Sequence, residues 1–168
     1  SIAAGRGDAQ IVGTAPKAEL LSVSIAFGIE GLDTDSQIAD GIIWAVDNGA
    51  QVINLSLTRN SVTWPESWDR AFSYAFENDV VIVAAAGNRA DGTEEVSAPA
   101  TIPGVIAVAG LDRNGLASEN FSTSGLSLGV TAPAEDLIGA FPGGEYRMWS
   151  GTSGATPIVS GMVALIRS

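Results

Sequence analysis

Hydrophobic residues along the 168-residue chain fall into two patterns, which predict two kinds of element. Short apolar runs rich in Val, Ile and Ala predict strands, and the run at 80–86 is too continuous to be half-exposed, so it is expected to be central in a parallel sheet. These runs cover residues 20–26, 51–57, 80–86, 105–109 and 128–131.

Three other stretches space their apolar residues as one face of a helix does. The first helix is expected to be capped by Thr34, Asp35 or Ser36 and to end before Gly49, with an inward face of Ile38, Ile42, Ala45 and Val46. The second has Pro65 in its first turn and an inward face of Trp68, Ala71, Phe72, Ala75 and Phe76. The third covers residues 152–167 and turns inward Ala155, Val159, Met162, Val163 and Ile166.

The order of these elements predicts a fold class. Strands that alternate with helices indicate an α/β domain with a mostly parallel sheet and right-handed crossovers. No linker and no internal repeat interrupts the pattern, so residues 1–168 are expected to form a single domain.

Composition narrows the choice of function. With 8 basic and 19 acidic residues the net charge is −11, which argues against nucleic acid and anionic membranes as partners. No apolar run reaches the roughly 20 residues of a membrane span. The chain has no cysteine, which excludes disulfides and thiolate chemistry, and no histidine, which removes the commonest general base.

One serine stands where a loop is expected to enter a helix. Ser153 is flanked by small residues in the stretch SGTSGATP, residues 150–157. Glycine permits close approach of a substrate, and the N–H groups of a helix start suit a developing oxyanion. From physics alone, a plain N-terminal cap is the better explanation of such a serine, because many helices begin with Ser or Thr.

The wider pattern resembles a known family. The stretch 150–157 resembles the serine motif Gly-Thr-Ser-x-Ala-x-Pro of the subtilisin-like serine proteases (subtilases), and VAAAGN at 83–88 resembles the strand that ends in their oxyanion-hole asparagine. DGIIWAVDNGAQVINLSL at 40–57 and PGVIAVA at 103–109 are similar to further family segments in the same order. The resemblance implies the three-layer α/β fold of subtilisin, with the first strand absent from this chain.

The resemblance also implies roles for individual residues. Ser153 is expected to be the nucleophile of a serine endopeptidase, with its own N–H and the Asn88 amide as oxyanion donors. A segment that pairs with the extended polypeptide substrate is expected at Ser56, Leu57 and Thr58. One wall of the pocket for the residue before the scissile bond is expected at Ala85, Ala86 and Gly87, with Ser97 near its base.

Several positions depart from the family pattern. Thr58 and Arg59 stand where many members have Gly-Gly, and the bulkier edge is expected to narrow or re-aim the substrate groove. Ile158 replaces a histidine that is not catalytic, and Gly154 replaces a common methionine. No cofactor is expected; the family's calcium loop corresponds to residues 5–13, where Asp8 supplies one carboxylate, so calcium is the only metal to consider.

In members of the family the catalytic triad follows the order Asp, His, Ser along the sequence. The Asp and the His have no counterpart in this chain. The resemblance places the histidine about seven residues before Ser1 and the aspartate further upstream, so an upstream segment of the protein is the expected partner of this chain. Without that base we expect residues 1–168 alone to be inactive. An extracellular or cell-surface location is also implied by the family.

Other interpretations have to be weighed. Residues 125–129 spell Gly-x-Ser-x-Gly, but no helical pattern and no histidine follow, as that motif requires. The sedolisin group shares a Gly-Thr-Ser motif and uses Glu and Asp as partners, yet it has Asp where this chain has Asn88. A non-catalytic interaction module is the remaining alternative.

Overall fold

The computed structural model describes residues 1–7, 11–89, 92, 94–121 and 124–168. Its centre is a parallel sheet with the order β1-β2-β3-β4. The strands are β1 (Val52–Leu55), β2 (Val81–Ala85), β3 (Ile106–Leu111) and β4 (Leu128–Pro133). The four later apolar runs are therefore confirmed as strands, and the run at 80–86 lies between two neighbours as its continuous apolarity predicts.

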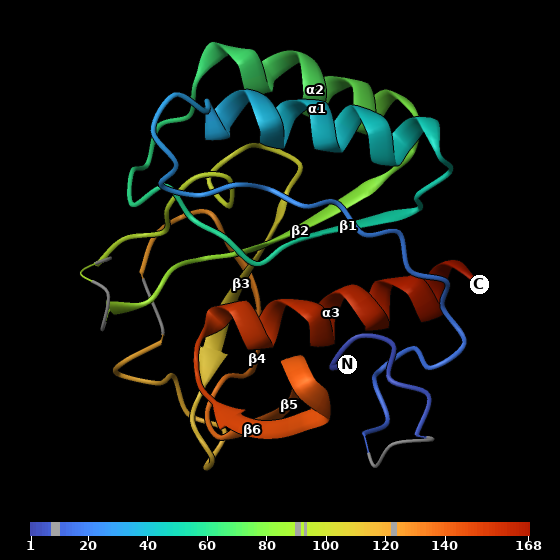
Figure 1. Ribbon diagram of the computed structural model, residues 1–168. Coiled ribbons are helices and arrows are strands. Elements are labelled where there is room, and N and C mark those ends of the chain that lie inside the picture. Colours follow the sequence, from blue (N-terminus) through green and yellow to red (C-terminus); the bar gives the residue numbers. More distant parts are fainter. Residues whose placement is uncertain (8–10, 90–91, 93, 122–123) are drawn as a thin grey trace.

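Helices cover both faces of the sheet, which confirms the three-layer α/β fold (Figure 1). The helices α1 (Thr34–Asp47) and α2 (Glu66–Glu77) lie on one face, and α3 (Thr152–Arg167) lies on the other. Each face has its own core. The larger core contains Trp68 and Phe72 from α2, and the smaller one packs Ala155 and Val159 of α3 against Val83 and Val108.

The structure corrects the predicted first residues of two helices and the predicted inward face of the third. Asp33, not one of the three residues after it, caps α1 and accepts hydrogen bonds from the N–H groups of Asp35 and Ser36. Pro65 is the residue before α2 and not its first residue. On α3 the inward positions Met162 and Ile166 are wrong, because their side chains are 52% and 81% exposed.

A hairpin that the pattern did not predict lies beside the start of α3. Strands β5 (Leu137–Phe141) and β6 (Glu145–Trp149) pair antiparallel around the short turn η2 (Pro142–Gly144). Most of its residues are exposed or half-buried, so neither strand carries the continuous apolar signal of a buried one. The hairpin nevertheless positions Trp149 two residues before the loop glycine that precedes α3.

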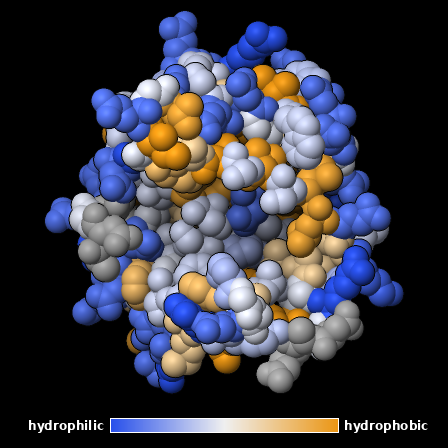
Figure 2. Space-filling view, in the orientation of Figure 1, coloured by the Kyte–Doolittle hydropathy of each residue, from blue (hydrophilic) through white to orange (hydrophobic). Residues whose placement is uncertain are grey.

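The prediction of a strand at residues 20–26 is wrong. The segment belongs to no sheet, and among the described residues only Ala26 in it makes main-chain hydrogen bonds, to the side chains of Gln37 and Thr34. Val23 and Ile25 pack toward α1 near Gly41. Leu20 is 69% exposed and Phe27 is 59% exposed, and Figure 2 shows hydrophobic side chains on the face over which this segment runs.

Candidate active site

Ser153 is the second residue of α3, at the carboxyl ends of the sheet strands. Its Oγ donates a hydrogen bond to the main-chain oxygen of Ser56, 3.2 Å away, and Ser56 Oγ donates to the main-chain oxygen of Ser153 at 2.9 Å. Gly151 precedes the helix with φ of 147°, a conformation that other residues rarely adopt. The structure thus brings together the predicted nucleophile and the first predicted substrate-binding residue, 97 positions apart.

Asn88 stands three residues beyond β2 and is fixed by the start of α3. Its Oδ1 accepts hydrogen bonds from the N–H and from the Oγ1 of Thr152, each at 2.9 Å. Because Oδ1 accepts both hydrogen bonds, the side-chain amide of Asn88 is fixed in one orientation, and Nδ2 is its donor group. Thr152 is almost fully buried, so this contact is a rigid link between Asn88 and the residue next to Ser153.

Sequence reasoning missed the role of Thr152. It identified Thr152 only as part of a motif, and the hydrogen bonds to Asn88 join residues 64 positions apart. The bond from Ser153 to the Ser56 oxygen was missed for the same reason. No pattern along the chain reports such pairs, although the two motifs that contain them were each recognisable.

The predicted substrate segment continues from the end of β1. Leu57 and Thr58 are partly buried and lie outside the β1–β2 pairing. Directly after them, Arg59 donates its N–H to the main-chain oxygen of Ala98 at 2.9 Å. The segment is therefore anchored at both ends, by β1 and by Ala98, with Ser56, Leu57 and Thr58 between.

The predicted pocket residues gather at the end of β2. Ala86 donates its N–H to Val108 O at 2.9 Å and accepts from the Ser97 N–H at 3.0 Å, so Ser97 lies against the predicted wall. The wall residues Ala85 and Ala86 are almost completely buried, as is Ser97, and Gly87 is buried too. The contacts bring all four residues together, and their role in holding a substrate side chain stays a prediction.

The β5–β6 hairpin leaves no room for a side chain at Gly154. A Cβ at this position would lie 2.6 Å from Leu137 Cδ1 and 3.3 Å from the ring of Trp149. The glycine in place of methionine is thus explained by the side chains that fill the space next to Ser153. Ile158, one turn further along α3, is partly buried and borders a shallow cavity with Leu137.

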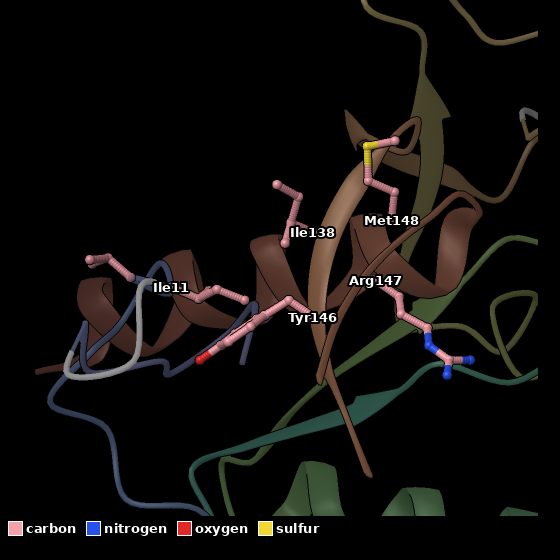
Figure 3. Close-up of a pocket in the computed structure, with 6 residues that line it drawn as sticks. Ile11, Ile138, Tyr146, Arg147 and Met148 are labelled. Atoms are coloured by element: carbon pink, nitrogen blue, oxygen red, sulfur yellow. The ribbon is translucent and has the colours of Figure 1, made fainter. Parts of the chain in front are cut away.

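Two cavities lie between this hairpin and the N-terminal loop that carries Ile11 and Val12. The larger, of about 480 Å³, is bordered by Ile11, Val12, Ile138, Tyr146, Arg147 and Met148, and the smaller has about 310 Å³. Figure 3 shows Tyr146 extending toward the N-terminal loop that carries Ile11, whereas Arg147 extends to the other side of β6. Neither lining includes Ser153 or Asn88, so these cavities are separate from the candidate site.

Titratable groups are absent from the immediate partners of Ser153. The chain contains no histidine, and within the part of the chain that the structure describes the side-chain hydrogen bonds at Ser153 join it to Ser56. The pKa of Asp33 is lowered, chiefly by the hydrogen bond from the Ser36 hydroxyl, but that carboxylate serves the start of α1. Among the described residues, no titratable side chain is in hydrogen-bond contact with the predicted nucleophile.

The described residues also show no metal centre. They contain no group of three His, Cys, Asp or Glu side chains that could hold an ion. In the expected calcium loop, Gly7 donates to Ile11 O and Gly13 donates to Gly5 O, while Asp8 lies outside the described residues. The calcium hypothesis therefore stays a prediction, and no catalytic step is assigned to a metal.

A serine at a helix start, beside a fixed asparagine amide and at the carboxyl edge of a parallel sheet, is the arrangement that the serine-type hydrolytic site predicted for this chain requires. Comparison with known proteins agrees: residues 1–168 match the subtilase family. The chain belongs to the subtilase family. This membership does not favour the sedolisin alternative.

Curated relatives and solved structures show how far the similarity extends. The chain is 42% identical over 159 residues to the thermophilic serine proteinase of Bacillus sp. (strain AK1), covering 94% of this chain and 38% of the relative. It is 40% identical over 158 residues to thermitase of Thermoactinomyces vulgaris, covering 94% of this chain and 54% of thermitase. The patellamide maturation protease PatA superposes with a TM-score of 0.87 at 37% identity, covering 98% of this chain and 61% of that one. The chain thus spans between about two fifths and three fifths of these relatives.

Within the described residues, no helix is both long and apolar enough to cross a membrane.

Proposed function

We propose that this chain carries the nucleophile and oxyanion half of a serine endopeptidase. The observation that supports the proposal best is the contact of Thr152 with Asn88, because it holds the Asn88 amide beside Ser153 in a single orientation. A preorganised donor of this kind stabilises the charge that develops on a carbonyl oxygen under attack. Family membership supports the same assignment.

The proposed reaction has two steps. Ser153 Oγ attacks the carbonyl carbon of the scissile peptide bond and gives its proton to a general base, and the tetrahedral oxyanion accepts hydrogen bonds from Asn88 Nδ2 and the Ser153 N–H. The base returns that proton to the amide nitrogen, the C–N bond breaks and the amine leaves, with an acyl ester on Ser153. Water, deprotonated by the same base, attacks that ester and releases the acid with regeneration of the serine hydroxyl.

The base and its orienting carboxylate are proposed to come from a segment outside these 168 residues. Two features of the fold support a docking place for such a segment. Among the described residues, β1 pairs with β2 on one edge and with no strand on the other, and residues 20–26 present exposed apolar side chains and main-chain groups outside any sheet. A strand that paired with β1 would satisfy its open edge.

The proposed substrate is an extended polypeptide. Main-chain hydrogen bonds to Ser56, Leu57 and Thr58 would give affinity with little dependence on side chains. We propose that the small residues Ala85, Ala86 and Gly87 leave room for a medium or large apolar side chain before the scissile bond. Cleavage profiling that showed a strict preference for a charged residue at that position would reject this part. An extracellular location remains part of the proposal.

Fluorophosphonate labelling tests whether the general base lies outside residues 1–168. Residues 1–168 alone are expected to react slowly and incompletely, because the Ser153 hydroxyl has no adjacent base to activate it. Protein that also contains the histidine and aspartate segments is expected to react quickly and to hydrolyse casein, and Ser153→Ala to abolish both. Rapid stoichiometric labelling of the 168-residue chain would overturn the assignment of the base to another segment.

The same experiment separates the enzyme from an interaction module. If the longer protein neither labels nor hydrolyses casein, and it still binds polypeptide with Ser153 replaced by Ala, the non-catalytic alternative is correct. Asn88→Ala is the second variant to test. It is expected to lower kcat by about 10²–10³, a size known for the loss of the equivalent donor in subtilisin, a member of the same family.

A further inference from the structure

Polar side chains lie between the end of β1 and α3. Ile53 and Leu55 of β1 belong to the core under α1 and α2. Because successive residues of a strand point to opposite faces, Asn54 and Ser56 face the other way, and both form hydrogen bonds with α3. The core on this side of the sheet consists of Val and Ala side chains, so polar groups at this place require an explanation.

The main-chain oxygen of Ser153 has no donor within α3. In an α-helix that oxygen accepts from the N–H four residues later, and the residue four positions after Ser153 is Pro157, which has no N–H. Ser56 Oγ takes the place of the missing donor, at 2.9 Å from Ser153 O. The start of the helix, with the predicted nucleophile on it, is therefore tied to a hydroxyl group at the end of β1.

The direction of the Ser56 hydroxyl is set by Asn54. Nδ2 of Asn54 donates to Ser56 Oγ at 2.9 Å. A hydroxyl has one proton and two lone pairs, so an oxygen that accepts from Asn54 keeps its own proton for Ser153 O. Oδ1 of Asn54 lies 2.9 Å from Ser160 Oγ, which shares its proton between Oδ1 and Thr156 O, 3.1 Å away. Ser160 thus holds the Asn54 amide with its donor group toward Ser56.

This relay, formed by Ser160, Asn54 and Ser56, runs from the interior to the candidate site. Ser160 is 6% exposed, whereas Asn54 and Ser56 are exposed residues. Ser56 also supplies the main-chain oxygen that accepts from Ser153 Oγ at 3.2 Å, and it is the first residue of the segment proposed to pair with substrate. One residue therefore contacts the nucleophile and, in the proposed complex, the peptide under attack.

We propose that Asn54 and Ser160 are positioning residues for Ser153 and act through the Ser56 hydroxyl. The proposal rests on the proposed function, because it concerns the same nucleophile and the same substrate segment. The intact relay holds Ser153 at a fixed place relative to the carbonyl carbon that it attacks, and a small displacement of reacting atoms slows a reaction. Loss of the relay loosens the start of α3, whereas β1 and Ala98 O still hold the segment that binds substrate.

The test measures kcat and KM with one peptide substrate, in protein that also contains the histidine and aspartate segments. Asn54→Ala and Ser160→Ala are each expected to lower kcat about five-fold, which corresponds to the roughly 1 kcal/mol of a typical hydrogen bond. KM is expected to change little. In a Ser56→Ala background neither change is expected to lower kcat further, because the hydroxyl through which both residues act is absent.

Ser118→Ala is the matched control. Ser118 is 2% exposed, and within the described part of the chain its hydroxyl bonds to Glu135, Asn120 and Phe121 and not to the relay. The variant therefore loses a buried serine hydroxyl, as Ser160→Ala does. Urea unfolding is expected to show a loss of stability in both variants, and kcat is expected to fall only in Ser160→Ala.

Three results would overturn the inference and leave the proposed function intact, provided that the protein hydrolyses the peptide through Ser153. If kcat is the same in wild type, Asn54→Ala and Ser160→Ala, the relay only stabilises the fold. If the fall in kcat persists in the Ser56→Ala background, the effect does not pass through Ser56. If Ser118→Ala lowers kcat as much, the effect is a general consequence of lost stability. If wild-type protein with the complete triad hydrolyses no peptide, the proposed function fails and the positioning role fails with it.

Discussion

Gly154 shows at the scale of one residue how the hairpin packs against the start of α3 beside Ser153. Any side chain at 154 meets Leu137 and Trp149 before it meets solvent. The packing fixes the first turn of α3, on which both Ser153 and the Thr152–Asn88 contact depend.

Gly154→Ala is expected to destabilise the protein by about 1–3 kcal/mol, the usual cost of inserting a methyl group into filled space. Urea unfolding of the two proteins measures the difference. Leu137→Ala in the same chain removes the atom that the new Cβ would meet, so the double variant is expected to lose less than the sum of the two single effects. Simple additivity would show that the crowding at Gly154 is relieved in another way.

Thr152 provides a second prediction at this scale. Thr152→Val keeps the shape of the side chain and removes the hydroxyl that donates to Asn88 Oδ1, while the main-chain donor remains. In the catalytically complete protein, kcat is expected to fall, and by less than in Asn88→Ala, because the amide donor is loosened and not removed. Thr152→Ser, which keeps the hydroxyl, is the control that is expected to retain most activity.

The sequence allowed the residues of this site to be named, but not their contacts. Ser153 and Asn88 each lie in a short motif that is specific enough to identify. The hydrogen bonds that orient them run to Ser56 and Thr152, at separations of 97 and 64 residues. Such contacts depend on how β1, β2 and α3 come together, and no local pattern records that arrangement.

At the scale of elements, burial decided which predictions were confirmed. The runs that became β1 to β4 are apolar because helices cover both faces of the sheet. The run at 20–26 carries the same signal but lies in no sheet, because a strand needs a neighbour as well as an apolar sequence. The strands β5 and β6 pair with each other but bury few side chains, so their sequences carry only a weak apolar pattern.

The carboxyl end of α3 is tied to the loop after α2 by one ion pair, whose pH dependence can be measured. The hydrogen bond from Arg167 lowers the pKa of Asp79 below its usual 3.8. A carboxyl with a lowered folded-state pKa stabilises the protein above its unfolded-state pKa, and this stabilisation is lost as pH falls through the folded-state pKa. Between pH 5 and pH values below 3.8, wild-type stability is therefore expected to fall more steeply than that of Asp79→Asn. Parallel pH profiles in urea unfolding would contradict this expectation.

At the scale of the whole molecule, stability rests on two cores separated by the sheet. Phe72 is almost completely buried in the larger core, and its ring contacts Trp68 in a tilted arrangement and Phe76 edge-on, all within the same helix. The smaller core is formed mainly by Val and Ala side chains under α3. The larger core, with its aromatic residues, is therefore expected to supply most of the apolar burial.

Phe72→Ala is expected to cost about 3–5 kcal/mol of folding free energy, a large share of the roughly 5–15 kcal/mol by which a domain is stable. Phe141→Ala is the matched control, because it makes the same change at a side chain that is 38% exposed on β5. Its effect on the urea midpoint is expected to be much smaller. Equal losses for the two variants would show that the core assignment is wrong.

The open edge of β1 and the extended residues 20–26 have a consequence for how residues 1–168 behave in concentrated solution. Exposed apolar side chains next to main-chain groups outside any sheet form a template onto which another polypeptide can add as a strand. Two copies of the chain that met along these edges would satisfy each other's hydrogen bonds, and further copies could continue the ladder. Self-association of the chain, and its retention by chaperones that hold exposed apolar segments, would then compete with any encounter between Ser153 and a substrate.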